Sequence, residues 1–252
     1  MHILVTNDDG IHAPGIAALS TALRKIDGAT VTVMAPAQNQ SAAGHRKTLH
    51  EPMRIKPATL MDGSSGFACS GSPADAIALA LLGYIKEKVD IVVSGVNQGA
   101  NLAQDITYSG TVTAAMEAAI SGIPAIAVSL DSHTDPAFEA ASSFAAKIAP
   151  MVFNTGLPRL TLLNVNVPYG EIKGVKVTRQ GHRIYLDELV ERIDPLGSPY
   201  YWIGGDRPSG HTEEVGTDVW AVALGYISIT PIRLDMTDMD FLHTVESWNL
   251  GA

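Results

Sequence analysis

The chain lacks the long apolar run that a membrane-spanning helix requires. None of its apolar stretches approaches the ~20 residues needed to cross a bilayer. Its first residues form an apolar strand pattern, without a basic segment, an apolar h-region or a small-residue cleavage site. We therefore expect no signal peptide, no membrane partner and a cytoplasmic protein.

Cysteine and positive charge are also scarce. The single Cys69 excludes an internal disulfide and fits a reducing compartment. It lies in the strand-like run Phe67-Ala68-Cys69-Ser70, which favours a buried small side chain over a nucleophile. Seventeen Lys and Arg against 26 Asp and Glu give a formal net charge of −9. This charge argues against wrapping a nucleic acid, but it allows a small anionic substrate that a local cation holds.

No linker, low-complexity tract or internal repeat divides the 252 residues. Strand-like and helix-like segments alternate up to residue 168, which is typical of a doubly wound α/β fold. We predict one domain over 1–252, with a Rossmann-like, mostly parallel sheet between two helical layers. Its core covers about 1–168 plus 213–232. The expected elements include a hairpin within 46–72, a strand over 89–93, a helix over 135–153 and a strand over 226–230 that Pro231 stops.

The pattern changes from residue 169 onward, where short β segments alternate with turns rich in Gly and Pro. We predict a protruding hairpin arm over about 170–212 and a C-terminal segment over 233–252 with an amphipathic helix at 240–248. The arm carries Tyr200, Tyr201 and Trp202 with little core of its own. We expect these aromatic residues to pack on a second subunit. An aromatic shelf for a base or ring is the alternative.

Two adjacent carboxylates follow the first predicted strand. Asp8 and Asp9 close the apolar run Ile3-Leu4-Val5, at the sheet edge where open α/β folds bind ligands. Adjacent carboxylates repel each other unless a cation or a shared proton relieves them. Oxygen ligands of this kind suit Mg²⁺ or Mn²⁺. The stretch Asn7-Asp8-Asp9-Gly10 also consists of ordinary turn residues, so a plain turn is the alternative.

Further polar residues follow strands that we predict to be parallel neighbours. They are Ser41, Asn97, Asn101 and the helix start Ser109-Gly110-Thr111. In such a sheet their tips converge, so the Ser41 hydroxyl and the Asn97 amide oxygen can join the two carboxylates in a sparse, hard oxygen site. The helix start makes a phosphate cradle, because free N–H groups point outward there. Taken singly, these are solvated loop, turn and N-capping residues.

Together these segments resemble the SurE (survival protein E) nucleotidases, which are metal-dependent phosphatases of nucleoside monophosphates. The resemblance lies in residues 3–15 around Asn7-Asp8-Asp9-Gly10, the 35–41 loop, Gly71-Ser72-Pro73-Ala74-Asp75, residues 94–101, Tyr108-Ser109-Gly110-Thr111-Val112 and Ser228-Ile229-Thr230-Pro231. It covers essentially the whole chain. Ala37 stands where family members often carry an acidic residue, and Ser72 replaces a common threonine. Neither departure removes a ligand.

The resemblance implies one divalent cation per subunit, Mg²⁺ or Mn²⁺, and a nucleoside 5′-monophosphate substrate, with 3′-monophosphates as a further possibility. The implied metal ligands are Asp8, Asp9, Ser41 and Asn97. The phosphate then lies near Ser109, Gly110 and Thr111, and Asn101 is a further substrate contact. We expect Asp8, Asp9, Asn97 and Ser109 to carry catalysis. The family also implies a homodimer or homotetramer whose C-terminal arms exchange between subunits.

The expected reaction is hydrolysis of a phosphomonoester, in which the metal neutralises phosphoryl oxygens and orients a water for in-line attack. Asp9 is a candidate acceptor of the water's proton, and His12 and His45 are candidate acids, although lone loop histidines are usually bystanders. Glu117 is a candidate supporting residue.

Other phosphate chemistries fit the motifs less well. A receiver domain needs an aspartate where this chain has Ser94 and Asn97. The Asp-x-Asp of haloacid-dehalogenase phosphatases and the Gly-x-Gly-x-x-Gly of dehydrogenases are absent from the corresponding place. A non-catalytic, Mg-dependent nucleotide-binding module stays open.

Overall fold

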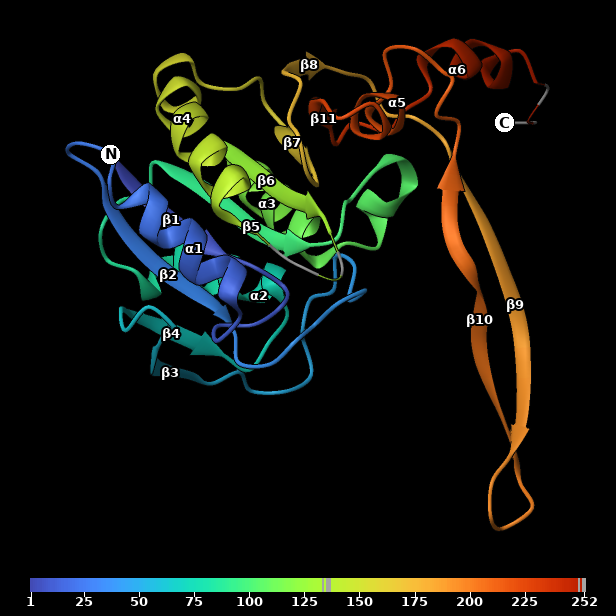
Figure 1. Cartoon of the computed structure of the whole chain (residues 1–252), viewed down its shortest axis with the longest axis horizontal. Coiled ribbons are helices and arrows are strands. Elements are labelled where there is room, and N and C mark those ends of the chain that lie inside the picture. Colours follow the sequence, from blue (N-terminus) through green and yellow to red (C-terminus); the bar gives the residue numbers. More distant parts are fainter. Residues whose placement is uncertain (133, 135–136, 249, 251–252) are drawn as a thin grey trace.

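The centre of the fold is a sheet built from the aliphatic and β-branched runs of the chain (Figure 1). The computed structural model describes residues 1–132, 134, 137–248 and 250. The strand order is β3 (Ile55–Thr59), β4 (Ser65–Cys69), β2 (Thr30–Pro36), β1 (His2–Thr6), β5 (Ile91–Gln98), β6 (Ala125–Asp131), β7 (Thr161–Pro168), β11 (Ile227–Arg233) and β8 (Val175–Val177). Neighbouring strands are parallel except β3 with β4 and β7 with β11.

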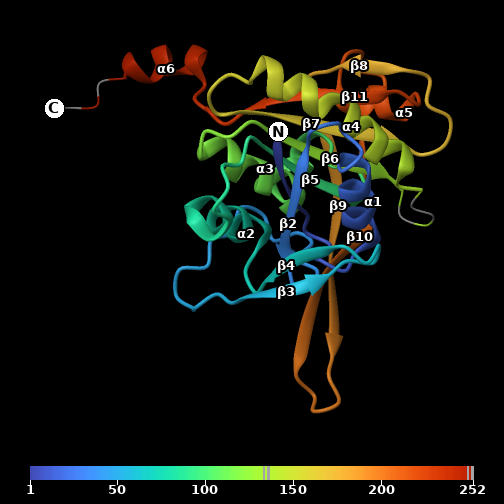
Figure 2. The same ribbon diagram turned by 90° about the vertical axis from the view of Figure 1, so that its left-hand side faces the viewer.

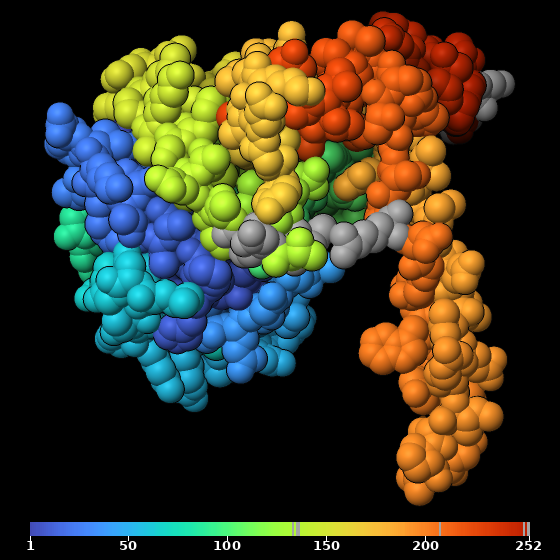
Figure 3. All heavy atoms as spheres, in the orientation of Figure 1, coloured from blue at the N-terminus to red at the C-terminus, as the bar shows by residue number. Residues whose placement is uncertain are grey.

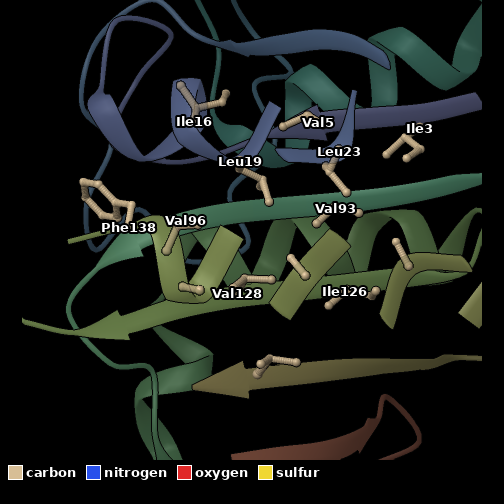
Figure 4. Packing of buried hydrophobic residues seen from close by; sticks show 14 of the residues in the cluster. Ile3, Val5, Ile16, Leu19, Leu23, Val93, Val96, Ile126, Val128 and Phe138 are labelled. Atoms are coloured by element: carbon tan, nitrogen blue, oxygen red, sulfur yellow. The ribbon is translucent and has the colours of Figure 1, made fainter. Parts of the chain in front are cut away.

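Helices cover both faces of this sheet (Figure 2). One face carries α1 (Pro14–Leu23) and α4 (Glu139–Thr155), and the other carries α2 (Pro73–Leu79), the π-helical turn η1 (Ala80–Tyr84) and α3 (Gly110–Ile120). Figure 4 shows the first core, where Ile16 and Leu19 of α1 pack with Val5, Val93 and Val128 of the central strands. The prediction of a mostly parallel sheet between two helical layers is confirmed. Within the described chain, no helix has the length and apolar character needed to cross a bilayer.

The first helical turns follow their sequence signals. Pro14 opens α1, where its missing N–H costs nothing. Ser72 caps α2, and its hydroxyl accepts from the Asp75 backbone while the Asp75 carboxylate accepts from Ser72. This reciprocal capping box is the arrangement that the Ser72-Pro73-Ala74-Asp75 segment favours. The hairpin expected within 46–72 is also confirmed as β3 and β4.

Two elements at the far edge of the sheet differ from the prediction. Residues 175–177 were expected in the arm, but as β8 they pair in parallel with β11. The strand expected to stop at Pro231 continues to Arg233. Beyond Ile229, β11 pairs with β7 on one side, while its pairing with β8 has ended. It is therefore an edge strand at Pro231, where a proline leaves no ladder bond unmade. The helix expected over 135–153 is α4, which begins at Glu139; residues 135 and 136 lie outside the described residues.

The hairpin arm covers fewer residues than the predicted range of about 170–212. It consists of β9 (Arg183–Ile193) and β10 (Pro199–Gly210), which pair antiparallel and extend away from the body (Figure 3). Between the arm and the C-terminus lie α5 (Asp218–Ala223), β11 and α6 (Met239–Glu246). Helix α6 has no buried residue, and the arm exposes the aromatic residues named above. The exposed surfaces of the arm and of α6 are compatible with packing on a second subunit, and that contact stays a prediction.

Candidate functional site

The carboxyl ends of β2, β1 and β5 meet at one edge, because these three strands are neighbours in the sheet. The chain leaves β1 through a tight turn that Asn7 closes on Gly10. The Asn7 Nδ2 donates to the Gly10 carbonyl (3.0 Å) and its Oδ1 accepts from the Gly10 N–H (3.2 Å). Gly10 has a φ of 102°, which favours glycine. The turn interpretation is therefore correct, and this same turn holds Asp8 and Asp9 at the sheet edge.

Asp8 is buried against the N-terminus of α3. Its carboxylate accepts a hydrogen bond from the Thr111 hydroxyl. Burial raises the pKa of Asp8, while the Thr111 hydroxyl and the backbone amides of Thr111 and Gly110 act in the opposite direction. An ideal Cβ at Gly110 would lie 2.6 Å from the Asp8 Cβ. Glycine thus lets the positive end of the helix approach the carboxylate closely.

Asp9 is half-buried beside Asp8. Its Oδ2 accepts from the Gln98 backbone N–H at 3.4 Å. Burial, followed by the negative charge of Asp8, raises the pKa of Asp9 to about 6, although the Gln98 amide opposes this shift. Two adjacent carboxylates therefore carry a charge that the protein leaves poorly compensated. A cation placed between them would lower this energy.

Strand β5 runs further than predicted and brings Asn97 to the site. It continues past residue 93 to Gln98, because its pairing with β6 shifts register between Ser94 and Asn97. Gly95 makes this possible: its φ is 138°, and an added Cβ would lie 2.3 Å from the Val128 carbonyl oxygen. The Asn97 Nδ2 donates to the Gly99 carbonyl (2.8 Å). Among the described residues, no donor binds the Asn97 Oδ1.

The loop after β2 carries Ser41 to the same place. The Gln40 N–H donates to the Asp8 carbonyl (2.7 Å), and the Gly44 N–H donates to the Tyr108 carbonyl (3.0 Å). These bonds fold the loop against both β1 and the start of α3. Ser41 itself is exposed.

A cleft of about 450 Å³ joins these elements. It is lined by Asp8, Ser41, Ala42, Asn97, Gln98, Gly99, Ala100, Asn101, Asp105, Tyr108, Ser109, Arg183 and Pro208. Three predicted site residues, Asp9, Gly110 and Thr111, are not part of this lining. Asp9 is the neighbour of Asp8 in the chain, and Gly110 and Thr111 contact Asp8 from the start of α3. Within the described residues, no three His, Cys, Asp or Glu side chains form a metal-binding group. Any cation here would therefore rely on neutral oxygens as well as carboxylates.

Asn101 and Ser109 each have a structural partner as well as a place in the cleft. The Asn101 Nδ2 donates to the Ser129 hydroxyl (2.7 Å), and its backbone N–H donates to Asn166 (2.7 Å). These contacts fix the 99–102 loop on β6 and β7. Ser109 caps α3 by accepting from the Val112 N–H at 3.1 Å. Capping therefore explains the position of Ser109, and its place in the cleft is compatible with a second role.

Neither candidate acid lines the cleft. His12 is exposed and its Nδ1 lies 3.2 Å from the Thr59 carbonyl. The His45 Nε2 lies 3.0 Å from Glu117, whose other oxygen is 2.8 Å from the Lys47 Nζ. Glu117 thus anchors the far end of the Ser41 loop to α3. The hydrogen bond from His45, supported by Lys47, lowers the pKa of Glu117 despite burial.

We expect Glu117→Ala to lower the free energy of unfolding by about 1–3 kcal/mol, because it leaves His45 and Lys47 of the loop without their acceptor. The pKa of Glu117 is lower in the folded state, so its contribution is complete above its ordinary value of 4.5 and fades as the pH falls below it. Urea unfolding at pH 7 and pH 3.5 should therefore show a difference from wild type that narrows in acid. The exposed Glu87→Ala is the control, with a change within about 0.5 kcal/mol at both pH values. A difference that widens in acid would contradict this assignment.

The sequence analysis missed the wall of the cleft at the base of the arm. The Arg183 Nε donates to the Asp105 carboxylate at 2.8 Å, and the Tyr185 hydroxyl donates to its other oxygen, also at 2.8 Å. The ring of Tyr108 meets Tyr185 edge to face, with centroids 6.2 Å apart. The first two pairs are 78 and 80 residues apart in sequence. No spacing rule links positions so distant, so only the folded chain reveals this group.

The chain is similar to a family profile, to several named proteins and to a solved structure. A family profile described as "Survival protein SurE" matches residues 3–187. A protein from Geobacter sulfurreducens named 5′-nucleotidase SurE is 51% identical and covers 100% of this chain and 95% of its own. One of the same name from Herpetosiphon aurantiacus is 49% identical over 99% of both chains. The crystal structure of SurE protein from Aquifex aeolicus superposes with a TM-score of 0.82 at 43% identity and covers 98% of both chains.

The match to the profile spans more than half of the chain, and the relatives match it from end to end. The β1 turn, the Ser41 loop and the end of β5 all lie inside the profile. The chain belongs to the survival protein SurE family.

Proposed function

We propose that the protein is a divalent-metal-dependent phosphomonoesterase that hydrolyses nucleoside 5′-monophosphates to nucleoside and phosphate. The observation that carries this proposal is that Asp8, Ser41, Asn97 and Ser109, which come from four separate segments, line one cleft. The names of the similar proteins support a 5′-nucleotidase. Hydrolysis of 3′-monophosphates is an extension that the same site chemistry permits.

The residues at the sheet edge fit one hard cation per subunit, Mg²⁺ or Mn²⁺. Asp8, Asp9, Ser41 and Asn97 offer carboxylate, hydroxyl and amide oxygens, and such a small donor set leaves positions for water. The charge of Asp8 raises the pKa of Asp9, and the Asn97 Oδ1 has no donor among the described residues. Both features fit a group of residues that holds a cation. When bound, the ion would supply positive charge to the phosphoryl oxygens and lower the pKa of a water.

The chain's own groups perform the remaining tasks. The Ser109 hydroxyl lies in the cleft at a helix N-terminus, where it can donate to a phosphoryl oxygen. Thr111 orients the Asp8 carboxylate through its hydroxyl. Asp9, next to Asp8 in the chain and with a pKa raised to about 6, is a candidate to accept the proton of the attacking water. Asn101 can accept from substrate through Oδ1, since its Nδ2 is bound to Ser129.

Phosphate release from nucleoside 5′- and 3′-monophosphates, with and without a chelator, tests the proposal. We expect a chelator to reduce turnover by at least about 100-fold, and Mg²⁺ or Mn²⁺ to restore it, because a phosphate dianion otherwise faces two carboxylates. Turnover that survives complete metal removal would reject the site. Metal-dependent nucleotide binding without phosphate release would instead favour the non-catalytic nucleotide-binding module.

We also propose a homodimer or homotetramer whose C-terminal arms exchange between subunits. In support, Trp202 and Ile203 of the arm are 63% and 85% exposed, and Phe241 of α6 and Trp248 just after it are about half exposed. Aromatic surfaces of this kind are favoured in interfaces.

A further inference from the structure

We propose that Tyr108 and Arg183 form a second half of the cleft that receives the nucleoside part of the substrate, so that the base of the hairpin arm determines specificity. This inference rests on the proposed function, because it assigns the leaving group of the same reaction. It makes Tyr108 and Arg183 substrate-binding residues and Asp105 a positioning residue.

The cleft is large enough to hold more than a phosphate group. Its volume of about 450 Å³ falls in the range of sites for whole small molecules, and a phosphate group fills only a minor part of it. Asp8, Ser41, Asn97 and Ser109 account for one region of the lining. Asp105, Tyr108, Arg183 and Pro208, from η2 (Ala103–Thr107), the residue before Ser109 and the base of the arm, line another.

Tyr108 offers an aromatic surface next to the phosphate region. It directly precedes Ser109 in the chain, and it is 59% exposed although its ring contacts Tyr185 edge to face at 88°. Tyr185 is itself fixed, because its hydroxyl donates to Asp105. A ring that is held in place yet open to solvent is a ready platform for stacking a nucleobase.

Arg183 brings a cationic side chain to the cleft, and it is the only one among the described side chains that line it. The Asp105 carboxylate binds its Nε at 2.8 Å, and its Nη1 lies 3.4 Å from the Pro208 carbonyl. Its Nη2 makes no hydrogen bond within the described part of the chain. A guanidinium fixed in this way can donate to ribose or base oxygens with little loss of side-chain freedom.

The backbone around Arg183 is tied to the cleft wall. The Arg183 N–H donates to the Gln104 side chain (2.8 Å). The buried Asp218 carboxylate accepts from the Ala103 and Gly181 N–H groups, both at 2.8 Å. These bonds join the start of β9 to the 3₁₀ turn η2 (Ala103–Thr107). The base of the arm is therefore a fixed part of the cleft, even though the rest of the arm extends into solvent.

The experiment compares adenosine 5′-monophosphate with ribose 5-phosphate, which lacks the base, as substrates of the full chain. We expect Tyr108→Ala to lower the ratio of kcat/KM for the nucleotide over kcat/KM for the sugar phosphate by about tenfold, mainly through KM for the nucleotide. Tyr108→Phe should keep the wild-type ratio, because it keeps the ring. Arg183→Gln should also lower the ratio. Tyr169→Ala, at an exposed tyrosine outside the cleft lining, is the matched control.

Binding of adenosine, measured by calorimetry, separates this subsite from the catalytic proposal. We expect Tyr108→Ala to raise the Kd for adenosine about tenfold, with an unchanged melting temperature. If the unmodified protein binds adenosine in this way but releases no phosphate, the subsite stands and the proposed function falls. Equal losses of kcat/KM for both esters, or adenosine binding that Tyr108→Ala leaves unchanged, would overturn the subsite.

Discussion

Asp8→Asn is expected to reduce phosphate release by about 10³-fold or more while the protein stays folded. The substitution removes one of two charges that would hold the cation, and with it the means of placing a phosphate dianion in an acidic cleft. The fold should tolerate it, because the asparagine carbonyl can still accept from Thr111 and because a buried charge is removed. Initial rates and thermal unfolding of the same preparation give both quantities.

Metal binding provides a second readout for this variant. An ion that binds only the folded state raises the melting temperature with its concentration, so wild type should be stabilised by Mn²⁺ and Asp8→Asn should not. The exposed Asp27→Asn is the matched control, and it should retain both turnover and the Mn²⁺ response. A variant at Asp8 that keeps its turnover within tenfold of wild type would contradict the proposed site.

Much of this sheet edge follows from local rules. The apolar run Ile3-Leu4-Val5 and the Asn7 to Gly10 turn place Asp8 after a buried strand, and the alternation of strands and helices makes its neighbours parallel. Convergence of the polar segments is then a consequence of topology. Ser109 caps α3 and also lines the cleft, so its capping role does not exclude the predicted contact with phosphate.

Features that depend on tertiary contact could not be predicted in this way. The register shift at Gly95 lengthens β5 because the strand accommodates the Val128 carbonyl, which no local pattern reveals. Pro231 ends a strand by propensity, yet it is tolerated because β11 is an edge at that point. Arg183 and Asp105 are 78 residues apart in sequence, and only the folded chain brings them into contact. The sequence analysis assigned this part of the chain to an arm with an intersubunit role and so overlooked its place in the cleft.

Gly110→Ala is expected to reduce turnover by about 100-fold, because it disturbs the contact on which the position of Asp8 depends. Alanine suits a helix better than glycine by about 1 kcal/mol. Here, however, its Cβ would meet the Asp8 Cβ at 2.6 Å and the Pro73 Cγ at 3.1 Å. The start of α3 must then move away from the carboxylate, which withdraws the Thr111 hydroxyl and shifts Ser109 in the cleft. Displacements on the order of 1 Å at a reacting centre cost about this much in rate.

A matched glycine separates this local effect from a general loss of stability. Gly63 has nothing within 4 Å of an added Cβ but a φ of 81°, so Gly63→Ala should destabilise the fold by about 1–2 kcal/mol through backbone strain and leave turnover unchanged. Gly110→Ala should lose far more activity than its own change in unfolding free energy explains. Urea unfolding and initial rates at saturating metal measure the two losses. Activity of Gly110→Ala close to wild type would show that Asp8 does not need the close approach of α3.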